Sequence, residues 1–203
     1  MIVRLVGSEM CIRDRIMLAY PLTVEFLQDK LEIGFFSVLW IAILISMMLA
    51  TEDIFSEDYN DGSLEQTLIK NPSFSIIIVT KIFTHWLLIG LPISILSFVF
   101  SLGTTEDLSL SLSILPLAII SSYIFLNLFV LGNALSLNKG SVLGALVTMH
   151  LALPVLIVLG KGLIAIQLDI NYQSFIFLLL GSLSIIIVAI PIVVSYVIKA
   201  HLE

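Results

Sequence analysis

Residues 175–198 read FIFLLLGSLSIIIVAIPIVVSYVI, and this stretch decides the class of fold. It runs for 24 residues without a charged side chain. A helix needs about 20 mostly apolar residues to cross the hydrocarbon core of a bilayer. The stretch is continuously apolar and lacks the alternation of a membrane β-barrel strand. It therefore predicts a membrane-spanning helix.

Four more apolar segments precede it, at residues 33–50, 76–102, 112–135 and 142–159, and none of the five contains Asp or Glu. Residues 16–22 are also apolar but too short to span, and they are interpreted as the tail of a further helix. Of the 203 residues, 59% are hydrophobic and 12% are charged, and the mean hydropathy is +1.15. In ordinary globular proteins about 45–50% of the residues are apolar and about 25% are charged. The expected fold is an all-α, polytopic membrane helical bundle.

The same composition excludes several classes of protein. The net charge of −6 and the shortage of Lys and Arg argue against a nucleic-acid partner, which would need cations for the phosphates. A single Cys cannot form an internal disulfide. The sequence has no Gly-rich phosphate loop, no metal-ligand cluster and no nucleophile–base motif. We therefore expect a protein that is not an enzyme and has no metal site.

Residues 1–15 differ from the rest of the chain. Residues 6–15 read VGSEMCIRDR and resemble a translated sequencing adapter. All three Arg residues and the only Cys lie in this segment, and its charges interrupt any apolar core of a signal peptide. We expect residues 1–15 to be non-native and residues 16–203 to form one transmembrane domain.

The positions of the Lys residues predict the orientation in the membrane. If the loop 51–75 is cytoplasmic, four of the six Lys lie inside and two lie outside. Cytoplasmic loops carry the excess of Lys and Arg. This favours a cytoplasmic position for residues 51–75, residues 136–141 and the C-terminus. The outer loops are then expected at 23–32, 103–111 and 160–174.

The loop 51–75 is the most informative hydrophilic segment. Six of the fifteen acidic residues lie between Glu52 and Glu65. Asp61-Gly62 is a turn signal, and Ser63 followed by Gln66 three residues later fits a helix-capping box. Two short helices around a sharp turn are predicted, with an apolar patch that includes Phe55. The alternative is a solvated acidic connector.

At these residues the sequence resembles the heme exporter protein B (CcmB) family. The string Asp61-Gly62-Ser63-Leu64-Glu65-Gln66 carries the resemblance, together with the run from Lys81 through His85-Trp86 to Gly90-Leu91-Pro92. The resemblance covers about residues 16–203. It implies a six-helix permease of the ABC-2 type in the bacterial inner membrane, here with five full spans and a truncated first one.

The resemblance also implies partners. ATP would bind a separate ABC ATPase subunit, and the complex would include a heme-handling membrane subunit, a small single-span subunit and a periplasmic heme chaperone. Heme is the candidate substrate, and no bound cofactor is expected. The loop residues expected to contact the ATPase subunit are Glu52, Asp53, Phe55, Asp61, Gly62, Ser63, Leu64, Glu65 and Gln66.

Candidate residues for heme contact lie within the membrane segments. His85 and His150 are selected because imidazole is the usual axial ligand of heme, and intramembrane ionisable residues often mark function. Trp86 is included with them because it follows His85 in the run that carries the resemblance. The alternative for each His is a hydrogen bond that supports helix packing. Gly140-x-x-x-Gly144 matches a close-packing motif and makes a homodimer a candidate assembly.

The expected function is a permease subunit for heme export, or for release of the heme chaperone, in c-type cytochrome biogenesis. Three alternatives stay open. A secondary transporter or channel is disfavoured because the spans lack carboxylates. A structural assembly subunit and an ABC-2 permease for another substrate also fit the sequence.

Overall fold

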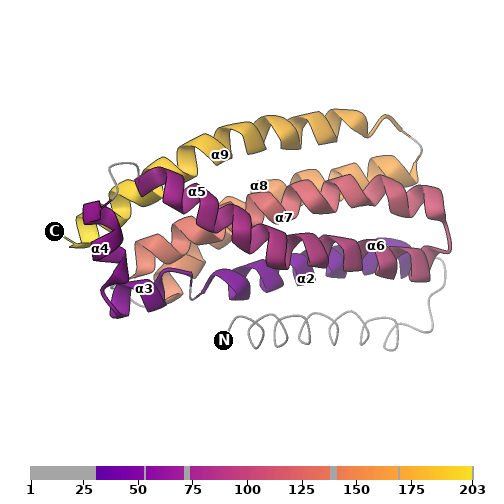
Figure 1. The fold of residues 1–203 in the computed structure, drawn as a ribbon. Helices are drawn as coiled ribbons and strands as arrows, with labels where there is room; N and C mark the ends of the chain where they lie inside the picture. The colour runs from indigo at the N-terminus through magenta and orange to yellow at the C-terminus, as the bar shows by residue number, and fades with distance from the viewer. Residues whose placement is uncertain (1–30, 53, 71–73, 138–140, 169, 203) are drawn as a thin grey trace.

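The structure is a computed structural model that describes residues 31–52, 54–70, 74–137, 141–168 and 170–202. The expectations for residues 1–15 and 16–22 lie outside these ranges. The described part is a bundle of long helices whose axes run along its length (Figure 1). Five of its helical stretches are long and apolar enough to cross a membrane. The predicted all-α polytopic bundle is therefore confirmed.

The long helices follow the expected segments but extend beyond them. Helix α2 covers Leu31–Thr51, α7 covers Leu108–Ser136, α8 covers Ser141–Gln167 and α9 covers Gln173–Leu202. The second segment is one long stretch made of α5 (Phe74–His85), a π-helical segment η2 (Trp86–Gly90) and α6 (Leu91–Thr105). Two short helices, α3 (Ser56–Asn60) and α4 (Ser63–Lys70), lie between α2 and α5.

Helix α7 lies at the centre of the bundle. In the apolar stretch of α7 that could span a membrane, 72% of the residues are buried. The corresponding share is 33% for the α5–α6 stretch and for α8, and 17% for α9. Small hydroxyl side chains such as Ser121 and Ser122 are fully buried along it, and they let neighbouring helices approach closely. The outer faces of α8 and α9 expose large apolar side chains, such as Ile157 and Ile185, as expected for surfaces in contact with lipid.

The connections on the far side from α3 and α4 are shorter than predicted. Between α6 and α7 only Glu106 and Asp107 are outside the helices, and the Asp107 carboxylate caps α7 by accepting from the Ser109 amide at 2.8 Å. The expected outer loop at 160–174 also shortens, because apolar residues continue past Lys161 and α8 runs on to Gln167. Lys161 therefore lies on α8 and not in a loop.

Helices α3 and α4 lie at the same end of the bundle as the C-terminus (Figure 1). The loop from 51 to 75 and the C-terminus were both predicted to face the cytoplasm, so their common end agrees with that part of the topology.

Candidate functional site

The site is the hairpin formed by α3 and α4. A five-residue helix ends at Asn60, Asp61 and Gly62 form the turn, and an eight-residue helix begins at Ser63. Gly62 has φ +74°, a left-handed conformation that a glycine adopts without strain. The prediction of two short helices around a sharp Asp-Gly turn is confirmed.

The predicted capping box is wrong in detail. Ser63 is already the first residue of α4, and its hydroxyl donates to the Asp58 carbonyl oxygen at 3.3 Å. The backbone N–H of Gln66 donates to the Gly62 carbonyl oxygen at 3.3 Å and not to the Ser63 hydroxyl. The capping side chain is Asp61, whose Oδ1 accepts from the Ser63 amide at 2.9 Å. The hydrogen bond from the Ser63 backbone N–H lowers the pKa of the Asp61 carboxyl below its ordinary 3.8.

Three apolar residues attach the hairpin to the bundle. Ile54, Phe55 and Leu64 are at most 4% exposed. Phe55 and Leu64 were expected to contact an ATPase subunit, but their side chains are covered by the protein itself. Burial of such side chains stabilises by about 1.5–3 kcal/mol each, so they position the hairpin.

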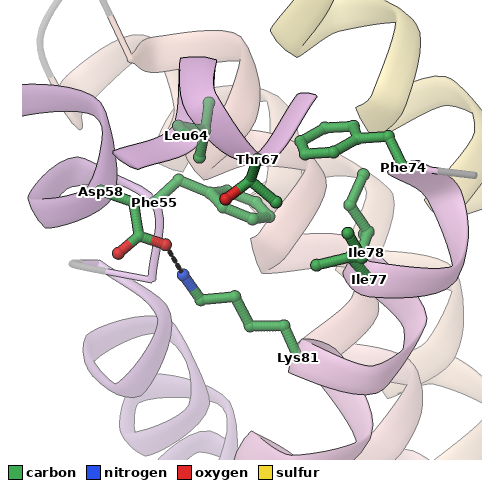
Figure 2. A pocket seen from close by; sticks show the side chains of 8 residues that line it. All are labelled: Phe55, Asp58, Leu64, Thr67, Phe74, Ile77, Ile78 and Lys81. Carbon is green, nitrogen blue, oxygen red and sulfur yellow. Dashed lines mark hydrogen bonds and ion pairs between the residues drawn. The ribbon is translucent and has the colours of Figure 1, made fainter. Parts of the chain in front are cut away.

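A small pocket lies between the hairpin and α5 (Figure 2). Its volume is about 80 Å³. It is lined by Phe55, Asp58, Leu64, Thr67, Phe74, Ile77, Ile78 and Lys81. At its edge the Lys81 ammonium forms an ion pair with the Asp58 carboxylate. The same ammonium lies 5.3 Å from the centroid of the Phe55 ring, within range of a cation–π interaction.

The start of the hairpin is tied to the central helix. The Asn133 side-chain amide on α7 donates to the Glu52 carbonyl oxygen. This hydrogen bond joins the residue that follows α2 to α7. The hairpin is therefore held at its start by α7 and linked to α5 by the Asp58–Lys81 ion pair and the residues of the pocket.

The other face of the hairpin is open. Glu52, Asp61, Glu65 and Gln66 are exposed, and Ile69 on α4 is 75% exposed. Gly62 and Ser63 are partly exposed at the turn. Asp53 lies outside the described residues. The exposed face thus combines acidic side chains with one large apolar residue.

The candidate heme residues lie on different helices. His85 is partly buried at the end of α5, and Trp86 follows it as the first residue of η2. His150 is exposed on α8, and its Nδ1 is 2.7 Å from the Leu146 carbonyl oxygen of the same helix. Within the described residues, no cluster of three or more His, Cys, Asp or Glu is arranged to hold a metal ion.

Trp86 belongs to a polar network that the sequence analysis did not identify. Its indole N–H donates to the Ser122 hydroxyl on α7 at 3.1 Å. The Ser94 hydroxyl is 3.1 Å from the same Ser122 oxygen and 2.8 Å from the Gly90 carbonyl oxygen. The indole also lies against Gly90, where an added Cβ would be 2.4 Å from its Cδ1. The network joins η2 to the centre of the bundle.

Gly144 makes an internal contact. An added Cβ there would lie 2.2 Å from the carbonyl oxygen of Gly132, so α7 and α8 cross with their backbones almost touching. This glycine had been considered for homodimer packing. Its contact with Gly132 occupies it, so a dimer would need a different surface.

Comparison with known proteins gives the family. A sequence model of the family described as "CcmB protein" matches residues 16–202. "Heme exporter protein B" of Haemophilus influenzae is 31% identical over 137 residues, which are 66% of this chain and 62% of that protein. The protein of the same name in Pseudomonas aeruginosa is 30% identical over 156 residues, or 74% and 68%. That of Escherichia coli K12 is 40% identical over 60 residues, or 30% and 27%.

Proposed function

This chain belongs to the CcmB protein family, and from that premise we propose that it is a membrane permease subunit of an ABC-type heme exporter in c-type cytochrome biogenesis. The names of the relatives supply the substrate. The five long apolar helices support a multi-pass membrane protein, and we place it in the bacterial inner membrane. A heme-handling membrane subunit, a small single-span subunit and a heme chaperone complete the proposed system.

The α3–α4 hairpin is the proposed docking site for the ATPase subunit, and its two-sided construction is the observation that carries the proposal. One face holds the buried anchors Phe55 and Leu64, which attach the hairpin to the bundle. The opposite face presents Asp61, Glu65 and Ile69 to solvent. A basic groove on the partner would complement the carboxylates, which set orientation and encounter rate, while Ile69 supplies apolar contact.

Heme is proposed as the transported or released substrate. His85 is the last residue of α5, and Trp86 is the first residue of η2. Both therefore lie within the second long apolar stretch of the chain. His85 is the stronger candidate for heme contact than His150, because the His150 ring is directed to its own helix. Neither residue is required for ATPase docking in this proposal.

Gly62→Val tests the docking site. Nothing lies within 4 Å of an added Cβ at Gly62, so the cost arises from the positive φ, which a β-branched residue strongly resists. Strain of this kind costs about 1–3 kcal/mol, which is enough to displace the turn but not to unfold five helices. We expect normal amounts of the variant in the membrane, weaker co-purification of the ATPase subunit and less mature cytochrome c.

The matched control is Gly181→Val on α9, where an added Cβ also meets nothing within 4 Å and φ is not positive. His85→Ala is a second control that should bind the ATPase normally. If Gly62→Val retains the ATPase as well as Gly181→Val does, with normal cytochrome maturation, the hairpin is an acidic connector and the docking site lies elsewhere.

A further inference from the structure

Asp58 connects three helices. It lies on α3, its backbone carbonyl accepts a hydrogen bond from the Ser63 hydroxyl of α4 at 3.3 Å, and its carboxylate pairs with Lys81 of α5. The hairpin and the first membrane helix after it are thus joined at one side chain. A displacement of either short helix would act on Lys81 through this contact.

The Asp58–Lys81 ion pair contributes little to the stability of the fold. The side chains of Lys81 and Asp58 are 27% and 41% exposed, so water screens their attraction. Pairs of this kind contribute little to folding. Phe55, which lies under the Lys81 ammonium, already attaches the hairpin by its burial. The ion pair links the hairpin to one particular turn of α5, the turn that carries Lys81.

That turn leads directly into η2. Lys81 is one helical turn before His85, and the π-helical segment starts at the next residue, Trp86. Short π-helical segments interrupt the regular hydrogen bonding of a helix and are frequent at functional sites. Here the segment is held by the hydrogen bond from the Trp86 indole to Ser122 and by the contact of the same indole with Gly90. A small rotation of α5 would act on Trp86 and on its hydrogen bond to Ser122 of α7.

We infer that the Asp58–Lys81 ion pair transmits movement of the α3–α4 hairpin to η2, so that the nucleotide state of the docked ATPase changes the environment of Trp86. Lys81 and Asp58 are positioning residues, since neither contacts substrate in this scheme. The inference rests on the proposed function, because the ATPase is what moves the hairpin.

The test uses Trp86 as its own reporter. The chain has two Trp residues, and Trp40→Phe leaves Trp86 alone. The Trp40 indole N–H is buried without a hydrogen-bond partner among the described residues, so within this part of the chain the replacement removes no hydrogen bond. The protein is labelled with 5-fluorotryptophan, reconstituted in nanodiscs with the unlabelled ATPase subunit, and followed by fluorine NMR with and without ATP. Binding of the ATPase subunit is measured separately by co-purification.

Four versions are compared on this background: the parent, Lys81→Met, the exchange Asp58→Lys with Lys81→Asp, and Lys161→Met. Lys81→Met keeps the apolar stem and removes the charge. Lys161 is exposed near the C-terminal end of α8. Its replacement therefore controls for the loss of one positive charge. The exchange restores an ion pair with reversed polarity.

We expect ATP to shift the Trp86 resonance in the parent and in Lys161→Met. In Lys81→Met the population that shifts should fall at least about fivefold, the lower end of typical coupling between sites, although the ATPase still binds. The exchange should recover part of the response. A normal response in Lys81→Met overturns the inference, as does an unresponsive resonance in the parent. Loss of ATPase binding in Lys81→Met reduces the pair to an anchor of the docking site and also overturns it. Absence of ATPase binding in the parent contradicts the proposed function itself.

Discussion

Gly144→Ala is the most direct test of how the bundle is packed. The added methyl group would lie 2.2 Å from the Gly132 carbonyl oxygen and 2.8 Å from the Ser136 hydroxyl oxygen, where ordinary contacts begin at 3.4 Å. The nearest obstacle is backbone, which cannot rotate away as a side chain can. Helices α7 and α8 must therefore separate by roughly 1 Å, which disturbs tightly packed neighbours along their contact.

The expected cost follows from this forced separation. Overpacking a close contact typically costs about 1–3 kcal/mol, and we expect Gly144→Ala to lower the free energy of unfolding by that amount. The assay is unfolding of the purified protein in mixed micelles as the fraction of SDS increases. The loss should be accompanied by faster proteolysis, because α8 packs less firmly on the central helix.

Gly160→Ala on the same helix is the matched control. Nothing lies within 4 Å of an added Cβ there, and Ala is the better helix former, so the change should stay within about 1 kcal/mol or stabilise slightly. If the two variants unfold alike, the close crossing of α7 and α8 does not exist in the protein and the reasoning is refuted.

Three further predictions follow from the same structure. With Cys11 replaced, a cysteine at Asn60 should react with a membrane-impermeant reagent only from the cytoplasmic side and one at Asn171 only from the periplasmic side; labelling of Asn60 from outside would reverse the topology. Ser122→Ala removes the acceptor of the η2 indole N–H and should lower the free energy of unfolding by about 1–3 kcal/mol in the micelle assay, whereas Ser184→Ala, an exposed hydroxyl bonded within α9, should change it little. The Asp61 pKa is lowered in the folded protein, so its contribution is present above pH 3.8 and is lost as the pH falls through the lower folded value. Protection of the hairpin from an acid-active protease should therefore fall in that range in the parent more than in Asp61→Asn.

Local sequence patterns were sufficient for the long helices and for the turn of the hairpin. Continuous apolar runs admit little besides spanning helices, and Asp61-Gly62 supplies both a capping carboxylate and a residue that tolerates φ +74°. The capping box was mistaken because two capping arrangements compete within a few residues. The Asp61 carboxylate accepts the hydrogen bond from the Ser63 backbone N–H, and Ser63 is therefore the first residue of the helix and not its cap.

Contacts between distant residues were not predictable in the same way. The apolar character of Phe55 and Leu64 indicated a contact surface, but it did not indicate whether a partner or the chain itself covers it. The partner of Lys81 is Asp58, 23 residues away, and several other carboxylates of the hairpin were equally plausible from the sequence. Only the fold selects among them.

The π-helical segment had no clear local signal. Trp86–Gly90 is apolar and compatible with an ordinary helix. The segment coincides with the indole of Trp86 lying over Gly90 and with the hydrogen bond to Ser122, and both depend on how α5 meets α7. The pairing of a bulky aromatic with a glycine four residues later is the one feature that, in retrospect, points to it.

The central proposal is that this chain couples ATP hydrolysis on its partner subunit to heme export. The measurement that tests it uses proteoliposomes that contain the ATPase and partner membrane subunits, with the ATPase facing outward. Heme is supplied outside, and a heme-free heme-binding protein is enclosed. The Soret band of the enclosed protein reports the arrival of heme. We predict that the band grows only when ATP and this chain are both present, and that Gly62→Val slows it while Gly181→Val does not. Equal growth without the chain, or growth that does not depend on ATP, would contradict the account.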